Sequence, residues 1–580
     1  MGNSTIYIIK ILPFSITFFL AIISIIALSL ADQSIKLDNK NQSMAAAANP
    51  YATKAAIEIL TSGGSAMDAA IAAALVLGLV EPQSSGIGGG GFLLHFDSNT
   101  KKVSSFDGRE TAPAEISKDI FQSSNGTLLD WKQAASGGLP VGVPGLISML
   151  YKAHKSHGKL PWSSLFGPAI NLAQKGFTIS PRLEKSIKSN LDLANFPNAR
   201  KYFFSPNGQP LKAGNILTNL PYARSLIEIS KHGPKALHRG NLAKQIVSSV
   251  QNSEINNGFL GLEDLEHYEA LEREPICKGY RDWVVCGMGP PSSGGLTLLQ
   301  ILGILSHFEL SKKSMQSLEV IHLISEASRL AYADRAQYMA DSDFVKVPIS
   351  GLLDENYIKS RAILINPKKA MNKVIPGTPP EINTNDFSVD ISPEFSSTTH
   401  LVVVDYLGNA VSLTASIERA FGSRLMVGGF MLNNQLTDFS FSSQKEGRMT
   451  ANRVEPRKRP RSSMSPVLVF DKSGNLVLAL GSPGGSRIIG YVLNTLVAIL
   501  DFGLTPSEAL KLPHHVNIGK GIELEKGTSI TNFTEGLKLL GHEVSVRALN
   551  SGIHVILVTK SKLLGGADPR REGTVLELVR

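Results

Sequence analysis

Ser396-Ser397-Thr398-Thr399-His400, followed at once by Leu401-Val402-Val403-Val404-Asp405, is the stretch on which the interpretation of this chain depends. A polar run ends in two adjacent threonines and a β-branched apolar run begins, which predicts a surface loop entering a buried strand. A Thr398 hydroxyl there could attack the peptide bond before it. Cleavage would leave an N-terminal threonine whose own α-amine, with a pKa near ~8, can act as general base. Taken alone, however, such a pair of threonines more often reflects β-propensity only.

Length and composition are typical of a globular protein, either one large α/β unit or several domains. The chain has 580 residues, of which 43% are hydrophobic, and its 52 glycines and 30 prolines indicate many tight turns. The net charge is +9, but the basic residues are scattered. The one dense cluster is interrupted by prolines and has no interleaved aromatic residues, so we expect a solvated loop and no nucleic-acid partner. The cluster consists of Arg453, Arg457, Lys458, Arg459 and Arg461.

The N-terminus predicts export. Residues 11–31 form an apolar run without a charge, and Ser29-Leu30-Ala31 places small residues at positions −3 and −1 of a cleavage point. This pattern is typical of a secretory signal peptide over residues 1–31. The run is also long enough to span a bilayer, so an uncleaved anchor is the alternative. In both cases we expect a periplasmic or extracellular protein.

Two cysteines, Cys277 and Cys286, lie on short strand-like pieces on either side of residues 278–282. An exported compartment permits a disulfide, and a hairpin would bring the two residues together. Two buried thiols are the equal alternative. Neither cysteine has a second Cys or a His at zinc spacing, so no metal is predicted here.

The first part of the chain reads as helices followed by a glycine-rich turn. Helix starts are indicated at residues 49–50 and 65–68, and the second helix, ending near Val80, is apolar nearly all round and should be buried. Gly86, Gly88 and Gly91 fit the dinucleotide pattern formally. They follow a helix and lead into a strand, which is the reverse of the required context, so we reject nucleotide binding.

Two further stretches could bind anions. Arg109 lies in a loop and could bind a carboxylate through its planar fork, although a surface ion pair is the commoner role of a lone arginine. Residues 481–486 form a glycine turn between a predicted strand and a predicted helix over 487–500. Free N–H groups at such a helix start suit an anion, or the oxyanion of an acyl-transfer reaction. Strands are predicted at residues 401–405, 410–416, 429–433, 466–470 and 476–480.

The order of these motifs resembles the γ-glutamyltransferase (glutathione hydrolase) family over residues 45–580. The matching pieces are Pro82-Gln-Ser-Ser-Gly-Ile-Gly-Gly-Gly-Gly91, Asp107-Gly-Arg-Glu110, Pro290-Pro-Ser-Ser-Gly-Gly295, Arg329-Leu-Ala-Tyr-Ala-Asp-Arg335, Thr398-Thr-His400, Asn433-Asn-Gln-Leu-Thr-Asp-Phe439, Arg459-Pro-Arg-Ser-Ser-Met464, Gly481-Ser-Pro-Gly-Gly-Ser-Arg487 and Asp568-Pro-Arg570.

This resemblance implies an α+β fold, the four-layer αββα sandwich of N-terminal nucleophile hydrolases. It also implies an inactive precursor that cuts itself between Ser397 and Thr398. The large (heavy) piece would be residues 32–397 and the small (light) piece residues 398–580, held together as a heterodimer within one folding unit. The substrates would be glutathione and other γ-glutamyl compounds.

The resemblance also carries over residues that bind the substrate. Arg109 would hold the α-carboxylate of the γ-glutamyl group, helped by the hydroxyls of Ser462 and Ser463. Asp438 would receive the α-ammonium, with Gln435 beside it. A zwitterionic group needs one cation and one anion, so these roles are chemically consistent.

The implied reaction is ping-pong acyl transfer. Thr398 attacks the γ-glutamyl carbonyl, its amine takes the proton, and the N–H groups of Gly484 and Gly485 hold the oxyanion. Water, an amino acid or a dipeptide then takes the glutamyl group. No cofactor or metal is required.

Three positions depart from the commonest family pattern. Ser416 stands where threonine is usual, so a hydroxyl thought to bond the nucleophile survives but rotates more freely. Glu418 stands where asparagine is common, and a carboxylate there can still accept from the substrate ammonium. Arg461 replaces a usual leucine, for which the sequence offers no physical account. Whether residues 440–453 form a lid over the site is open.

The sequence leaves two alternative functions open. The nearest is an acylase for glutaryl-type side chains, or a poly-γ-glutamate-cleaving enzyme, on the same fold; Asp438 argues for a substrate with an α-amine, which a glutaryl group lacks. The other is a non-catalytic, membrane-anchored relative, which Ser416 alone hints at. Asn125 and Asn532 would carry glycans only in a eukaryotic secretory pathway.

Overall fold

The computed structural model describes residues 1–2, 41–123, 125–381, 387–390, 392 and 397–580. The predicted signal segment, residues 11–31, lies outside these ranges, as do residues 393–396 just before the expected cleavage point. Within the described ranges, none of the helices is both long enough and apolar enough to cross a bilayer.

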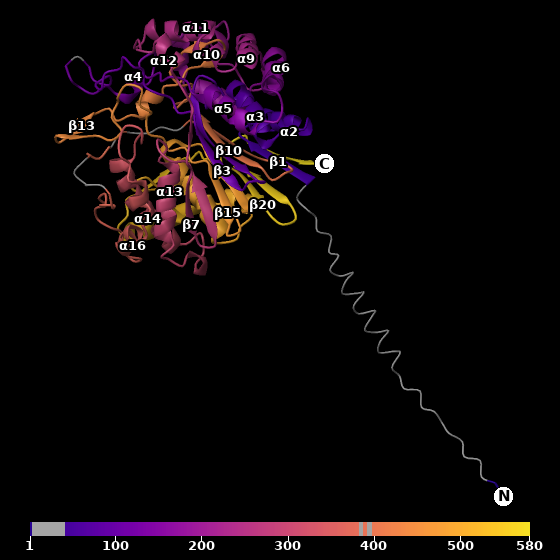
Figure 1. Ribbon diagram of the computed structural model, residues 1–580. Coiled ribbons are helices and arrows are strands. Elements are labelled where there is room, and N and C mark those ends of the chain that lie inside the picture. Colours follow the sequence, from indigo (N-terminus) through magenta and orange to yellow (C-terminus); the bar gives the residue numbers. More distant parts are fainter. Residues whose placement is uncertain (3–40, 124, 382–386, 391, 393–396) are drawn as a thin grey trace.

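Two antiparallel sheets form the centre of the molecule (Figure 1). In order across the seven-stranded sheet, its strands are β22 (Thr574–Val579), β1 (Gln42–Ala47), β9 (Thr399–Val404), β10 (Ala410–Ser416), β2 (Gly90–Asp97), β3 (Lys102–Asp107) and β6 (Leu271–Arg273). The six-stranded sheet contains β21 (Leu563–Ala567), β20 (His554–Val558), β16 (Leu476–Gly481), β15 (Val467–Asp471), β8 (Trp283–Gly287) and β7 (Ile276–Tyr280). The strands predicted at 401–405 and 410–416 are therefore neighbours in the first sheet.

The alternation of side chains along β9 divides the interior into two cores. Leu401 and Val403 belong to a core that they share with the helices on one face of the seven-stranded sheet. Val402 and Val404 belong to a second core, together with residues of the six-stranded sheet. Because successive side chains of a strand point to opposite faces, one apolar run serves both cores. This explains why the run has no polar alternation.

Helices cover the two sides of this arrangement (Figure 1). α2, α3 and α5 contribute to the first core, and α13, α14 and α17 contribute to the second. The predicted capping box is confirmed at the start of α3, where the Ser65 N–H donates to Asp68 Oδ2 at 2.9 Å and Ser65 Oγ accepts from the Asp68 N–H. The helices of eight or more residues are α2 (Pro50–Thr61), α3 (Ala66–Val80), α5 (Leu146–His157), α6 (Gly167–Lys175), α7 (Pro181–Lys188), α9 (Leu220–His232), α11 (Asn241–Gln251), α13 (Gly294–Leu305), α14 (Leu318–Tyr338), α16 (Glu355–Ile363) and α17 (Ile488–Leu500).

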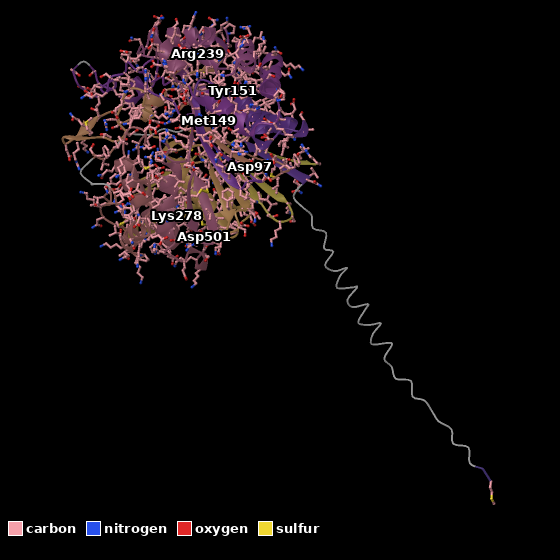
Figure 2. All side chains as sticks on the ribbon, viewed as in Figure 1. Asp97, Met149, Tyr151, Arg239, Lys278 and Asp501 are labelled. Carbon is pink, nitrogen blue, oxygen red and sulfur yellow. A yellow bond between two sulfur atoms is a disulfide. The ribbon has the colours of Figure 1, made fainter. Side chains whose placement is uncertain are left out.

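Cys277 and Cys286 are directly opposite each other on the β7–β8 hairpin and are joined in a disulfide. The alternative of two buried thiols is wrong. Figure 2 labels Lys278 of the same hairpin, which lies at the end of the molecule opposite Tyr151 of α5.

Two sequence-based predictions are wrong. The strand predicted at 429–433 is a two-residue piece, β12 (Phe430–Met431), which pairs with β11 (Met426–Val427). Gly428 and Gly429 both have positive φ, so they form the turn between these short strands. The other error concerns the basic cluster.

That basic cluster is not a solvated loop, because three of its members are buried. Lys458 Nζ binds Glu455 Oε1 at 2.7 Å, and Arg461 Nη2 binds Asp390 Oδ2 at 2.9 Å. The Arg459 main-chain N–H donates to Asp341 Oδ2 at 2.8 Å. Composition revealed the cations but not their acidic partners, of which Asp390 and Asp341 come from elsewhere in the chain.

Candidate active site

Neighbouring strands bring Thr398 and Ser416 together. Thr398 immediately precedes β9, and Ser416 is the last residue of β10. The antiparallel register pairs Thr399 with Ala415, so the two hydroxyl residues lie at the same edge of the sheet. Thr398 Oγ1 and Ser416 Oγ are 3.3 Å apart, and both residues are buried.

Both hydroxyls contact the carbonyl group of Ser397. Thr398 Oγ1 donates to the Ser397 carbonyl oxygen, and Ser416 Oγ donates to the same oxygen at 3.1 Å. Ser416 Oγ in turn accepts a hydrogen bond from the Glu418 N–H at 2.9 Å. Ser416 Oγ accepts this hydrogen bond through a lone pair, so its single proton stays available to the Ser397 carbonyl oxygen. That is the oxygen on which negative charge would develop if Thr398 attacked the peptide bond.

A small cavity brings together all but one of the predicted catalytic and substrate-binding residues. Gly484 is the exception, although its neighbour Gly485 does line the cavity. The lining residues are Arg109, Ser397, Thr398, Ser416, Glu418, Gln435, Asp438, Ser462, Ser463, Met464, Gly485 and Ile488. The peptide bond at Ser397–Thr398 therefore faces the same space as the groups predicted to bind substrate.

The charged part of the cavity is built on Arg109. This side chain is fully buried, so the alternative of a surface ion pair is wrong. Its Nη2 binds Asp438 Oδ2 at 2.6 Å and the main-chain oxygen of Arg461 at 2.8 Å. Gln435 Nε2 also donates to Asp438 Oδ2, at 2.7 Å. A cation, an anion and an amide thus lie within hydrogen-bonding range of one another in the cavity wall.

Two carboxyl groups beside this charged part have raised pKa values. Burial, followed by repulsion from Asp438, raises the pKa of Glu418 well above its ordinary value. Burial raises the pKa of Glu110 to about 8, although the nearby Arg109 guanidinium acts in the opposite direction. Glu110 Oε2 lies 3.6 Å from Arg109 Nη1. At neutral pH the Glu110 carboxyl therefore favours the protonated form, and the pKa of Glu418 is shifted in the same direction.

The serine pair is held in position by defined partners. Ser462 Oγ accepts from the Met464 N–H at 3.1 Å, and Ser463 Oγ accepts from Arg335 Nη2 at 2.7 Å. Ser462 also pairs with Ser292 in a parallel bridge. These contacts leave both serines on the cavity wall.

Gly484 and Gly485 form the turn between β16 and α17, as the sequence predicts. Both have positive φ, 143° and 62°, which favours glycine. A Cβ on Gly484 would lie 2.6 Å from the Tyr491 ring. The oxyanion role of their N–H groups stays a prediction.

Sequence reasoning missed two buried arginines. Arg461, which had no physical account, forms an ion pair with Asp390, seven residues before the scissile bond. Its own N–H binds Asn452 Oδ1 at 2.9 Å. Arg571 donates to the main-chain oxygen of Thr398 at 3.0 Å. The only signal for Arg571 was its position after the Asp568-Pro-Arg570 motif.

The segment for which a lid was left open is a hairpin. β13 (Gln444–Lys445) pairs with β14 (Arg448–Met449) and projects from the body of the molecule (Figure 1). Its base is tied to the segment before the scissile bond, since the Ser388 N–H donates to the Met449 oxygen at 2.9 Å. Phe441 stacks on Phe121 with ring centroids 4.1 Å apart.

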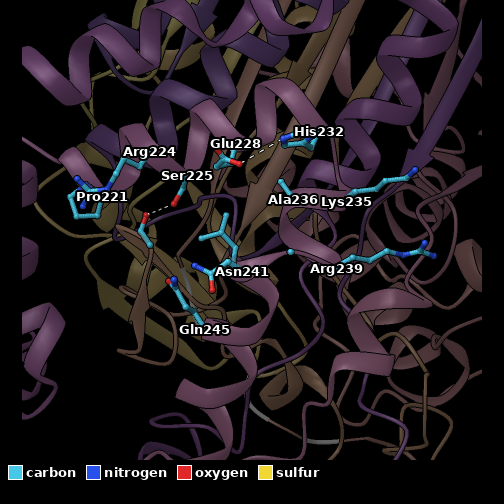
Figure 3. Close-up of a pocket in the computed structure, with 13 residues that line it drawn as sticks. Pro221, Arg224, Ser225, Glu228, His232, Lys235, Ala236, Arg239, Asn241 and Gln245 are labelled. Carbon is cyan, nitrogen blue, oxygen red and sulfur yellow. Dashed lines mark hydrogen bonds and ion pairs between the residues drawn. The ribbon is translucent and has the colours of Figure 1, made fainter.

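A second, larger hollow lies among α9, α10 (Lys235–His238) and α11 (Figure 3). None of the predicted site residues lines it. Glu228 and His232, two of its polar side chains, are exposed, and His232 Nε2 lies 3.8 Å from Glu228 Oε2. The smaller cavity at Thr398 is therefore the better candidate. Within the part of the chain that is described, no three His, Cys, Asp or Glu side chains are arranged to hold a metal ion.

Comparisons with known proteins agree on one family. The sequence model of a family described as gamma-glutamyltranspeptidase matches residues 52–578. The chain is 37% identical over 550 residues to the glutathione hydrolase proenzyme of Escherichia coli (strain K12), covering 91% of this chain and 90% of that protein. It is 33% identical over 537 residues to the acylase ACY 1 proenzyme of Pseudomonas sp. (strain V22), covering 91% and 92%. The crystal structure of cephalosporin acylase from Bacillus halodurans is similar in fold, with a TM-score of 0.80 and 26% identity over 92% of this chain and 96% of that chain.

Proposed function

This chain belongs to the gamma-glutamyltranspeptidase family, and from that premise we propose that it is a self-cleaving γ-glutamyltransferase and glutathione hydrolase. One observation carries the proposal. The hydroxyls of Thr398 and Ser416 both bond the Ser397 carbonyl oxygen, in a cavity whose wall also holds the Arg109–Asp438 ion pair. A nucleophile at a peptide bond and a site for a zwitterion thus occur together.

Self-cleavage would proceed through an ester. Thr398 Oγ adds to the Ser397 carbonyl carbon, and Ser416 donates to the oxyanion. The C–N bond then breaks, the leaving nitrogen gains a proton, and Ser397 is left esterified to Thr398 Oγ. Water hydrolyses this ester to give a Ser397 carboxylate and a free Thr398 amine and hydroxyl. The products would be the heavy piece, ending at Ser397, and the light piece, starting at Thr398, which stay together as a heterodimer.

Turnover would use the same hydroxyl. Thr398 Oγ attacks the γ-carbonyl of the substrate while the new α-amine takes the hydroxyl proton. That proton passes to the leaving amine, which is cysteinylglycine when the substrate is glutathione. The N–H groups of Gly484 and Gly485 would donate to the oxyanion. Water, an amino acid or a dipeptide then attacks the γ-glutamyl ester and restores the Thr398 hydroxyl.

Recognition would replace the Arg109–Asp438 contact with contacts to the substrate. Arg109, with Ser462 and Ser463, binds the α-carboxylate, and Asp438, with Gln435, binds the α-ammonium. Glu418 lies in the same wall and would accept from the ammonium once it has lost its proton. The contact of 2.6 Å between Arg109 and Asp438 supports this, because two opposite charges so close together match the two ends of an amino acid.

An acylase acting on glutaryl-type side chains is the second candidate, favoured by the similarity to an acylase proenzyme. Asp438 and Gln435 argue against it, since a glutaryl group has no α-ammonium for them to bind. A non-catalytic anchored relative is a weaker candidate, because it does not explain why the hydroxyls of Thr398 and Ser416 both bond the Ser397 carbonyl oxygen. A poly-γ-glutamate-cleaving enzyme on the same fold would share this nucleophile.

Export, with residues 1–31 acting as a signal peptide or residues 11–31 as an anchor, also belongs to this proposal. So does the four-layer order of helices, sheet, sheet and helices, which the division of side chains between the two cores supports.

The test uses the chain without residues 1–31 and its Thr398→Ala variant. Intact mass after incubation at neutral pH should show two pieces meeting at Ser397/Thr398 in the first protein and one uncut chain in the second. The mature protein should then release p-nitroaniline from the γ-glutamyl anilide much faster than from the glutaryl anilide. An uncut chain would refute the nucleophile, and a preference for the glutaryl compound would select the acylase.

A further inference from the structure

Arg571 makes a direct contact with the residue that carries the proposed nucleophile. It lies in the turn between β21 and β22, and its Nη1 donates to the Thr398 main-chain oxygen at 3.0 Å. Its Nε and Nη2 both donate to the Asn550 oxygen, at 3.2 and 3.0 Å. Within the described residues, all the hydrogen bonds of its side chain go to main-chain carbonyls. The charge is thus held by dipoles and not by a carboxylate.

The surroundings leave room for this guanidinium and bury it. Arg571 is only 8% exposed. Gly552 lies against its side chain, and a Cβ there would come within 2.5 Å of Arg571 Cδ and 2.8 Å of Pro483. Gly552 thus lies against both Arg571 and Pro483, which belongs to the glycine turn that precedes α17. A larger residue at position 552 would displace Arg571.

The remaining charges near Thr398 come from several elements. Arg182 of α7 lies behind Arg571 and binds Glu81 at 3.1 Å. Burial and then repulsion from Arg182 lower the pKa of Arg571 to about 9, while Glu81, Asp568 and Tyr491 act in the opposite direction. The guanidinium is still charged at neutral pH. On the cavity side, burial raises the pKa of Glu418, and Asp438 is paired with Arg109.

Two further titratable groups near the nucleophile are His554, whose pKa burial lowers to about 3, and His400, whose ring stacks on it. His400 Nδ1 bonds Thr414 Oγ1 at 2.8 Å, and burial lowers the pKa of His400 well below the ordinary value. Both histidines are therefore neutral at working pH. Arg571 is then the buried cation in direct contact with Thr398.

We propose that Arg571 is a positioning residue that fixes the Thr398 main chain and keeps the α-amine of the mature enzyme unprotonated, so that it can act as base. The inference rests on the proposed function, because it requires Thr398 to be the nucleophile. The nitrogen and oxygen of one residue are at most about 3.6 Å apart, so the guanidinium lies within about 7 Å of the amine. A charge at that distance disfavours an ammonium by about one to two pKa units.

The test compares the pH dependence of kcat/KM in mature protein with the γ-glutamyl anilide. The acid limb of this profile reports the base of the free enzyme. Arg571→Met should move the limb upward by about one pH unit, with at least a fivefold loss at pH below the limb and a much smaller loss above it. Arg571→Lys keeps the charge and should leave the limb within about 0.3 unit. A uniform loss at all pH values, with an unmoved limb, would reduce Arg571 to a structural role.

Arg182→Met is the matched control, because it removes a neighbouring cation whose side chain bonds Glu81 and Ser84 instead of Thr398. It should move the limb by less than about 0.3 unit, and an equal shift would show a general charge effect instead. If Arg571→Met fails to mature, the pH profile of Arg571→Lys becomes the test. This variant keeps the charge, so an acid limb raised by one pH unit would overturn the proposal. Thr398→Ala separates the two hypotheses. Residual activity in that variant would refute the nucleophile itself, whereas complete loss there together with an unmoved acid limb in Arg571→Met would refute only the role of Arg571.

Discussion

Replacing Ser416 with alanine should slow self-cleavage strongly without preventing folding. Ser416 Oγ lies 3.1 Å from the Ser397 oxygen, and the Glu418 N–H orients its proton toward that oxygen. Removing one such oxyanion donor typically costs about 10²–10³ in rate, or about 2.7–4 kcal/mol of activation free energy. Precursor made in a cell-free reaction, sampled over time and resolved by mass, would give the rate constant directly.

Ser412→Ala is the matched control for this experiment. Ser412 is a buried serine on the same strand, β10, and its hydroxyl donates to the Leu480 oxygen at 2.9 Å, away from Ser397. It should cleave within about threefold of the parent. Ser416→Thr should cleave at least as fast as the parent, because a β-branched hydroxyl has fewer rotamers to search. Cleavage of Ser416→Ala within about tenfold of the parent would refute the oxyanion role.

Three further predictions follow from the same geometry. Asp438→Asn should lower kcat/KM for the γ-glutamyl anilide by about 10–100-fold, the value of a charged hydrogen bond, and leave the slow glutaryl reaction unchanged in a parallel assay. Arg461→Leu leaves the buried Asp390 carboxylate unpaired, so urea unfolding of the uncut Thr398→Ala chain should show a loss of about 3–5 kcal/mol, most of which Asp390→Asn restores. Glu110, with its folded pKa raised to about 8, holds a proton that the unfolded chain releases near pH 4.5, so the free energy of unfolding should fall by about 3–5 kcal/mol as pH rises from 4.5 to 8. Glu110→Gln cannot titrate and should flatten this slope in urea titrations at pH 5 and 8, whereas an unchanged slope would mean that other groups cause it.

Local patterns predicted the strands at Thr398 well because burial on both faces leaves a clear signal. The apolar run after Thr399 became β9, and the hairpin partner became β10 with Ser416 at its end. The register that places Ser416 opposite the scissile bond follows from the short turn between these strands. Sequence patterns therefore predict the structure well where residues that pack together are also close along the chain.

The charged part of the cavity could not be predicted from local patterns. Arg109 and Asp438 are 329 residues apart in sequence, so only the family resemblance placed them together. The basic cluster shows the same limitation. Arg461 looked solvated because its partner, Asp390, comes from a distant segment. Long-range charge pairs leave no periodic signal in a single sequence.

The uncut bond explains why the precursor should be inactive toward added substrates. Ser397 lines the same cavity as Arg109, and its carbonyl oxygen already accepts hydrogen bonds from the hydroxyls of Thr398 and Ser416. The chain thus places its own carbonyl where a γ-carbonyl would have to bind. The amine that would serve as base is still an amide nitrogen in this state, and an amide nitrogen cannot accept the proton. Cleavage therefore has two separable effects, since it vacates the carbonyl position and creates the base. A precursor trapped by Thr398→Ala should bind a γ-glutamyl inhibitor weakly even though Arg109 and Asp438 are in place, because Ser397 still occupies the position of the substrate carbonyl.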